Sequence, residues 1–102
     1  MGPRRVDWEE MDEPEGPPEV DLHGLRPSDA LRRLSSALVA ARLRRSTELV
    51  VVTGKGLGNL RQEPILRDKV EAWLAGPEGA RHGVTGVARE PHGGALRARL
   101  RV

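Results

Sequence analysis

Residues 48–59, Glu-Leu-Val-Val-Val-Thr-Gly-Lys-Gly-Leu-Gly-Asn, join an apolar stretch to a glycine-rich loop. The apolar part, residues 48–52, is rich in β-branched side chains and does not alternate with polar ones. Such a pattern is typical of a strand that is covered on both faces or lies at the centre of a sheet. The three glycines that follow allow the backbone to turn tightly. The segment therefore predicts a buried strand with a loop at its carboxyl end.

A short strand and a helix are predicted upstream of this segment. Residues 19–23, Glu-Val-Asp-Leu-His, alternate polar and apolar side chains, as in a half-buried strand. Pro27 suits the first position of a helix, and the carboxylate of Asp29 suits its positive end. Apolar residues then recur at helical spacing to about residue 45. They are Leu31, Leu34, Leu38 and Ala41.

A second helix and two strands are predicted downstream. The helix begins at about Pro64, and Gly-Pro at 76–77 ends it. Residues 84–88 form a plausible strand, residues 92–94 a turn, and residues 95–102 a strand of strict alternation. The helix residues expected on one apolar side are Ile65, Leu66, Val70, Trp73 and Leu74. The inward residues of the last strand are expected to be Leu96, Ala98, Leu100 and Val102.

The order βαβαββ predicts an α/β fold, a two-layer sandwich in which a four-stranded mixed sheet carries two helices on one face. Short connections favour parallel strands joined by right-handed crossovers, which place both helices on the same side. The segments 21–26 and 53–59 then leave the carboxyl ends of parallel strands. Ligand sites collect there in open α/β sheets.

Composition limits the chain to one small aliphatic domain. Its 102 residues include no Cys, Phe or Tyr and only two Trp, so aliphatic side chains must form nearly all of the core. Without cysteine there is neither a disulfide nor a thiolate zinc site. No apolar run approaches the length of about 20 residues that a membrane helix needs, and the start of the chain lacks the apolar core of a signal peptide. We therefore expect a cytoplasmic protein with no membrane partner.

The charge is divided along the chain. Residues 1–20 carry seven acidic and two basic side chains, whereas residues 21–102 carry eight acidic and 15 basic ones. Because residues 1–18 hold few apolar groups, we expect a disordered acidic leader before a basic domain of residues 19–102. Fifteen of the 17 basic residues are arginine, whose planar guanidinium binds phosphate in a bidentate way. Nucleic acid is therefore the first partner to consider, although GC-rich coding also raises arginine content.

Asp21 and His23 lie two residues apart on the first predicted strand. Side chains alternate between the faces of a strand, so the carboxylate and the imidazole should lie side by side, with Val20 and Leu22 on the other face. Such a pair suits a histidine that transfers a proton while a carboxylate orients it. It also suits two ligands of a divalent metal such as Mg²⁺ or Mn²⁺. A histidine that only hydrogen-bonds a turn carbonyl gives the same pattern.

The glycine-rich loop has the composition of a phosphate-binding loop. Its backbone N–H groups can approach an anion closely, with Lys55 as a positive charge and Thr53 as a hydroxyl donor. It matches neither the Walker nor the dinucleotide-binding pattern, so we expect no nucleotide cofactor. A loop that only makes a tight strand-to-helix turn is the alternative. The residues expected to contact nucleic acid are Arg26, Thr53, Gly54, Gly56, Gly58 and Arg61, with a stripe on the last strand formed by Arg97, Arg99 and Arg101.

Four segments together resemble the Smr (small MutS-related) domain family. They are Val-Asp-Leu-His-Gly-Leu at 20–25, Thr-Gly-Lys-Gly at 53–56, Pro-Ile-Leu-Arg-Asp-Lys-Val-Glu-Ala-Trp-Leu at 64–74 and Gly-Gly-Ala-Leu-Arg-Ala-Arg-Leu at 93–100. The segment before the last strand is shorter than the family's more usual Gly-Gly-x-Gly-Ala-Leu. The resemblance implies a βαβαββ two-layer sandwich similar to the C-terminal domain of bacterial translation initiation factor three, in agreement with the order derived above.

The resemblance also implies nucleic-acid binding and, as in many members, endonuclease activity on DNA or RNA. The family's Asp-x-His motif corresponds to Asp21 and His23, and its Thr/His-Gly-x-Gly loop to residues 53–56. We therefore predict an endonuclease in which His23 moves the proton, Asp21 orients His23 or holds a divalent metal, and Lys55 stabilises developing charge. DNA nicking, RNA cleavage associated with ribosomes and binding without cleavage stay open. The acidic leader with its Trp8 could instead serve protein interaction, and this alternative stays open. The oligomeric state stays open as well.

Overall fold

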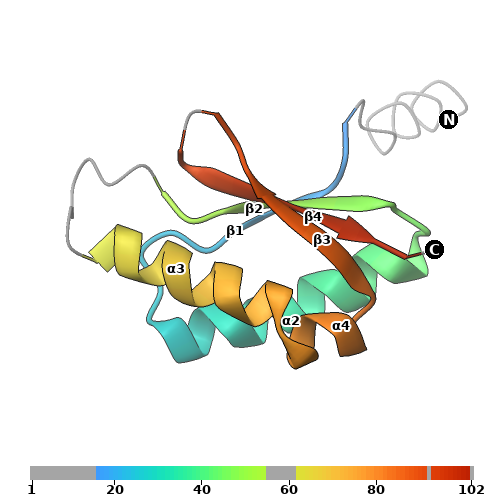
Figure 1. Cartoon of the computed structure of the whole chain (residues 1–102), viewed down its shortest axis with the longest axis horizontal. Coiled ribbons are helices and arrows are strands. Elements are labelled where there is room, and N and C mark those ends of the chain that lie inside the picture. The colour runs from blue at the N-terminus through green and yellow to red at the C-terminus, as the bar shows by residue number, and fades with distance from the viewer. Residues whose placement is uncertain (1–15, 55–61, 92, 102) are drawn as a thin grey trace, which may run out of the picture.

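The computed structural model of the protein describes residues 16–54, 62–91 and 93–101. In these residues the strands β1 (Glu19–Asp21), β2 (Glu48–Val52), β3 (Val84–Arg89) and β4 (Ala95–Leu100) form one sheet. The helices α2 (Pro27–Leu43), α3 (Gln62–Ala75) and α4 (Pro77–Arg81) lie on one side of it (Figure 1). The predicted α/β two-layer sandwich is confirmed.

The strand order β1-β2-β4-β3 makes the sheet mixed. β1 and β2 are parallel, while β4 is antiparallel to both of its neighbours, β2 and β3. The last strand in the sequence therefore lies between β2 and β3. The connection from β2 through α3 to β3 passes over this strand. The first strand is shorter than predicted, because it ends at Asp21 and the chain turns from there.

The helix α2 begins and is buried much as its sequence pattern predicts. Pro27 occupies the first turn, Asp29 places a carboxylate at the positive end, and the helix ends at Leu43. Its buried residues are Ala30, Leu34, Leu38 and Ala41. The predicted Leu31 is only half-buried, since the buried stripe follows a spacing of four residues through Ala30 instead.

The helix α3 buries a narrower face than predicted, and a further short helix follows it. Leu66, Val70 and Leu74 are buried, but Ile65 is 51% exposed, so its predicted inward position is wrong. Helix α4 was not predicted, because Gly-Pro at 76–77 indicated only the end of a helix. Pro77 in fact also begins the next one, since its fixed φ suits a first helical turn.

The core is aliphatic, as the composition predicts. Its largest fully buried side chains are leucines and valines from both layers, and they contact one another across the sheet–helix interface. Within residues 16–54, 62–91 and 93–101, no helix has the length and apolar character needed to cross a membrane.

Candidate active site

The carboxyl ends of β1 and β2 lie side by side at one end of the sheet. We use the word edge below for such an end, where strands stop and loops begin. Asp21 is the register partner of Val52, and the Leu22 N–H donates to the Val52 carbonyl at 2.7 Å. The two segments singled out by the sequence therefore leave the sheet at the same edge. This is the edge at which α/β sheets bind ligands.

A tight turn positions His23 just beyond β1. The Leu25 N–H donates to the Leu22 carbonyl at 3.2 Å, which places His23 and Gly24 at the two central positions of a β-turn. Gly24 has φ +78°, the conformation that the second central position of a type II turn requires. Leu22 is fully buried and holds the turn to the core, while His23 is exposed at its corner. His23 therefore lies in a turn and not on the strand.

The predicted pairing of Asp21 with His23 is nevertheless confirmed. His23 Nδ1 lies 2.6 Å from Asp21 Oδ1, and the His23 backbone N–H donates to the same oxygen at 3.1 Å. Their side chains are 61% and 53% exposed, respectively, whereas Val20 and Leu22 are buried on the other face. A carboxylate at Nδ1 favours the tautomer that is protonated there, so Nε2 becomes the nitrogen that exchanges a proton.

The electrostatics of the pair keep the carboxylate ionised. The hydrogen bond from the His23 side chain lowers the pKa of Asp21 below its ordinary value of 3.8, and the Arg33 guanidinium adds a smaller attraction, while partial burial opposes both. An ionised carboxylate beside the ring stabilises the imidazolium that forms when His23 accepts a proton. Arg33 is not among the site residues predicted from the sequence. The signal that could have identified it is that α2 follows the His23 turn directly, so its first two turns stay near Asp21.

The beginning of the glycine loop does not present the donors expected of it. Thr53 is fully buried, and its hydroxyl has no hydrogen-bond partner among the described residues. The N–H groups of Thr53 and Gly54 both donate to the Gly94 carbonyl, at 3.0 and 3.1 Å. These contacts tie the loop to the start of β4, so both N–H groups are already used within the protein. The residues Lys55, Gly56, Gly58 and Arg61 lie outside the described part of the chain.

Arg26 is placed beside the turn, as expected. It is the exposed residue that precedes α2, and with Gly24 and Ile65 it lines a pocket of about 280 Å³ between the turn and the start of α3. The exposure of Ile65 is explained by this position at the pocket. Arg26 and Arg33 thus supply positive charge on the α2 side of the Asp21–His23 pair.

The three arginines of the last strand do not form one positive stripe. Arg97 pairs with Glu48 at 2.6 Å and with Glu90 at 2.7 Å, and the two carboxylates, Glu90 first, raise the pKa of the guanidinium. Its charge is therefore neutralised locally. Arg99 is exposed on the sheet face that the helices leave uncovered, whereas Arg101 lies past the far end of β4.

The described metal-ligating side chains at this edge are too few to hold a metal ion by themselves. They fit only a metal ion that the substrate also coordinates. The described residues contain no group of three or more His, Cys, Asp or Glu side chains able to ligate one ion. Mg²⁺ commonly binds through one or two carboxylates together with substrate phosphates. Both contacts with His23 use Asp21 Oδ1, so Oδ2 is the atom with which Asp21 would coordinate such an ion.

Comparison with known proteins gives consistent matches. The family model described as the Smr domain matches residues 20–101. Endonuclease MutS2 of Thermus thermophilus is 45% identical over 78 residues, which is 72% of this chain and 10% of the relative. The crystal structure of the Smr domain of Thermus thermophilus MutS2 superposes with a TM-score of 0.58 at 32% identity, covering 83% of this chain and 99% of that one. The chain spans about a tenth of the length of the full relative. Because the family model covers most of the sequence, the chain belongs to the Smr domain family.

Proposed function

We propose that this protein binds DNA or RNA and cleaves its phosphodiester backbone at the Asp21–His23 edge. The single observation that carries the proposal is the 2.6 Å contact between His23 Nδ1 and Asp21 Oδ1, at an exposed edge of an α/β sheet. The membership in a family that also contributes a domain to a protein named endonuclease supports it.

His23 is the group that moves the proton. With Nδ1 directed at Asp21, Nε2 accepts a proton from the attacking hydroxyl or water and returns it to the leaving oxygen. Asp21 holds the ring in the required tautomer and stabilises its charged form, the role of a positioning carboxylate. Where a divalent metal takes part, it would supply charge stabilisation of the phosphate, with Asp21 as the protein ligand.

Positive charge around the edge would hold the backbone phosphates. Arg26 and Arg33 lie on the α2 side of the pair, and Lys55 follows Gly54 directly in the sequence. The Lys55 role as a charge on the scissile phosphate remains a prediction. Because the Thr53 and Gly54 N–H groups are engaged by Gly94, side chains more than backbone donors would bind the phosphate here.

A cleavage assay distinguishes a nuclease from a domain that only binds nucleic acid. Full-length protein is incubated with supercoiled plasmid and with structured RNA, each with Mg²⁺, Mn²⁺ or chelator. We expect cleavage of one substrate class by the unmodified protein and loss of most of it in Asp21→Asn. Asp29→Asn is the matched control, since Asp29 is an exposed carboxylate at the start of α2. Binding to both substrates without cleavage in any lane would leave a non-catalytic nucleic-acid-binding domain.

A further inference from the structure

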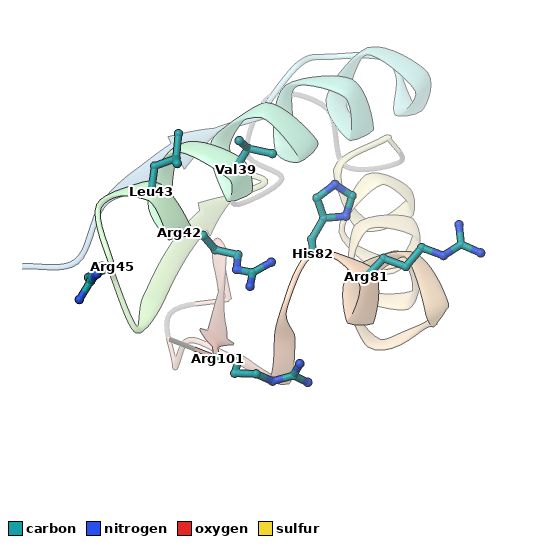
Figure 2. A pocket seen from close by; sticks show the side chains of 7 residues that line it. All are labelled: Val39, Arg42, Leu43, Arg45, Arg81, His82 and Arg101. Atoms are coloured by element: carbon teal, nitrogen blue, oxygen red, sulfur yellow. The ribbon is translucent and has the colours of Figure 1, made fainter.

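A second charged surface lies at the edge of the sheet opposite the Asp21–His23 pair. A groove of about 740 Å³ separates the end of α2 from α4, with the far end of β4 beneath it. Figure 2 shows Arg42 extending from α2 into the space between this helix and His82, the residue that follows α4. We call this the arginine groove. The residues that define it are Arg42, Arg45, Arg81 and Arg101, with the apolar Val39 and Leu43.

The charge of the arginine groove is largely uncompensated. Among the described residues Arg42, Arg45 and Arg101 have no ion-pair partner, and Arg81 pairs with Glu78 on the same helix at 3.0 Å. Among the residues that the structure describes, no Asp or Glu side chain lines the groove. His82 directs Nδ1 at the Glu78 carbonyl at 2.9 Å and packs its ring 5.4 Å from Trp73, so it forms part of the wall.

The groove is apolar as well as basic. Val39 and Leu43 are 51% and 80% exposed, and among the described residues only Ile65, at the opposite edge, is another exposed large hydrophobic side chain. A nucleic-acid backbone gains little from two exposed aliphatic side chains, because its contacts with protein are mainly to phosphate and sugar. An acidic peptide that also carries apolar side chains complements both features.

Arg45 occupies a backbone position that would favour glycine. Helix α2 ends in a Schellman motif, in which the Ser46 N–H donates to the Ala41 carbonyl and the Arg45 N–H to the Arg42 carbonyl, both at 2.9 Å. Arg45 takes the left-handed residue of this motif, with φ +61°. A non-glycine residue there costs about 1 kcal/mol, so the fold gains nothing from arginine at this position.

The first described residues of the chain, from Gly16 on, lie beside this arginine. The Pro18 carbonyl accepts from the Val50 N–H at 2.9 Å, which fixes the entry into the sheet. Gly16, Pro17 and Pro18 line a cavity of about 380 Å³ together with Arg45, the residue that also belongs to the arginine groove. Whatever precedes Gly16 therefore begins next to the groove.

We propose that residues 1–15 of this chain bind in the arginine groove. They carry six acidic and two basic side chains, and their large apolar residues are Met1, Val6, Trp8 and Met11. Their carboxylates pair with the groove arginines, and Trp8 covers Val39 and Leu43. Eight residues of extended chain span about 27 Å, so Trp8 can reach this surface from Gly16. The bound leader also shields these arginines from polyanions.

The absence of cysteine makes a spin-label experiment direct. A nitroxide spin label is attached to Glu10→Cys in the full-length, isotope-labelled chain. The intensities of the backbone amide signals in NMR spectra are then compared before and after the nitroxide is reduced. We expect a loss of intensity at the amides of Val39, Leu43 and Arg101. The loss should disappear in Arg45→Gly/Arg101→Ser and in concentrated salt, since both weaken the ion pairs.

The same experiment includes the results that overturn the proposal. An equal loss in the double variant shows that tethering alone brings the label near. In a second sample, isotope-labelled chains without a nitroxide are mixed with spin-labelled chains of natural isotope content. If amide intensity is lost in this mixture and not in the chain that carries both labels, the leader binds the groove of a second copy. Shift changes in the groove on adding an oligonucleotide, without label-induced loss there, make it a nucleic-acid surface. Arg45→Gly alone is expected to raise the melting temperature, which shows that weaker leader binding is not a folding defect.

Discussion

His23 and His82 lie at opposite edges of one small domain and use the same ring nitrogen in different ways. Both direct Nδ1 at an oxygen, but the partner of His23 is the Asp21 carboxylate at 2.6 Å and that of His82 is the Glu78 backbone carbonyl at 2.9 Å. The carboxylate carries a full negative charge that stabilises an imidazolium, whereas a carbonyl offers only a dipole. His82 is half-buried and packed on Trp73, while His23 is exposed at the corner of a turn.

The difference shows why the surroundings of a histidine decide its chemistry. One edge pairs an exposed imidazole with a carboxylate and leaves arginines nearby to hold a phosphate. At the other edge the described residues around the imidazole are arginines and aliphatic side chains, with no Asp or Glu among them, a lining that suits an anionic ligand. We therefore expect the Asp21–His23 edge to carry the proposed cleavage and the arginine groove to bind the leader.

The largest contrast is expected in cleavage. His23→Ala should lower the rate by about 10²- to 10⁴-fold, because a positioned acid–base group contributes about that much. His82→Ala should keep the rate per folded molecule and lower only the melting temperature, since it loses packing on Trp73. Rates under single-turnover conditions, with melting curves for both variants, provide the comparison. Equal rate losses in the two variants would remove the division between the edges.

Two glycines support the two edges, and their replacement should differ in severity. A Cβ on Gly79 would overlap the Leu74 backbone under α4, so Gly79→Ala should destabilise the fold by about 3 kcal/mol. A Cβ on Gly24 would meet no atom within 4 Å, but φ +78° strains any other residue, at a cost of about 1 kcal/mol. Urea unfolding of both variants measures this, and a larger loss for Gly24→Ala would contradict the packing described for α4.

Arginines at the two edges should contribute unequally to nucleic-acid binding. Arg26→Ser should reduce the slope of log affinity against log salt by about 1, the value for one lost phosphate contact. Arg101→Ser should change the slope less, because the leader competes for the groove. Fluorescence anisotropy at several salt concentrations tests both variants. A larger slope change for Arg101 would make the groove part of the nucleic-acid interface, as the alternation of the last strand first suggested.

The smallest effect concerns the stability that the Asp21–His23 pair supplies. The folded-state pKa of Asp21 is below its ordinary value of 3.8, so the contribution is present above about that pH and is lost as the pH falls through the folded-state value. Both side chains are largely exposed, which limits the effect to less than about 1 kcal/mol. Asp21→Asn should therefore be less stable than the unmodified protein at neutral pH, and the difference should vanish in strong acid. A difference that does not shrink as the pH falls below 3.8 would come from packing instead.

The sequence predicted the fold well because its signals are local. β-branched runs, alternation in the last strand and apolar spacing in the helices each depend on neighbouring residues, and the sheet, its mixed character and the side of the helices followed from them. The insertion of β4 between β2 and β3 could not be predicted in this way, since it depends on pairing between distant segments. Helix α4 was missed because Gly-Pro at 76–77 predicts only the end of a helix, whereas Pro77 also begins the next one.

The candidate site was predicted only where it depends on one short segment. The Asp21–His23 pair follows from spacing, and it persists although the turn replaces the strand at His23. The pairing of Arg97 with Glu48 and Glu90 depends on strand register, and the capture of the Thr53 and Gly54 N–H groups by Gly94 depends on the position of β4. Neither is visible in a residue pattern.

Chemical rescue tests most directly the claim that His23 moves the proton. Single-turnover cleavage is measured for His23→Gly at saturating protein concentration, with increasing imidazole in the buffer, while anisotropy follows binding. The account predicts that the variant binds nucleic acid normally, cleaves at a greatly reduced rate and regains activity in proportion to the neutral imidazole present. Cleavage by His23→Gly at the unmodified rate without imidazole would contradict it.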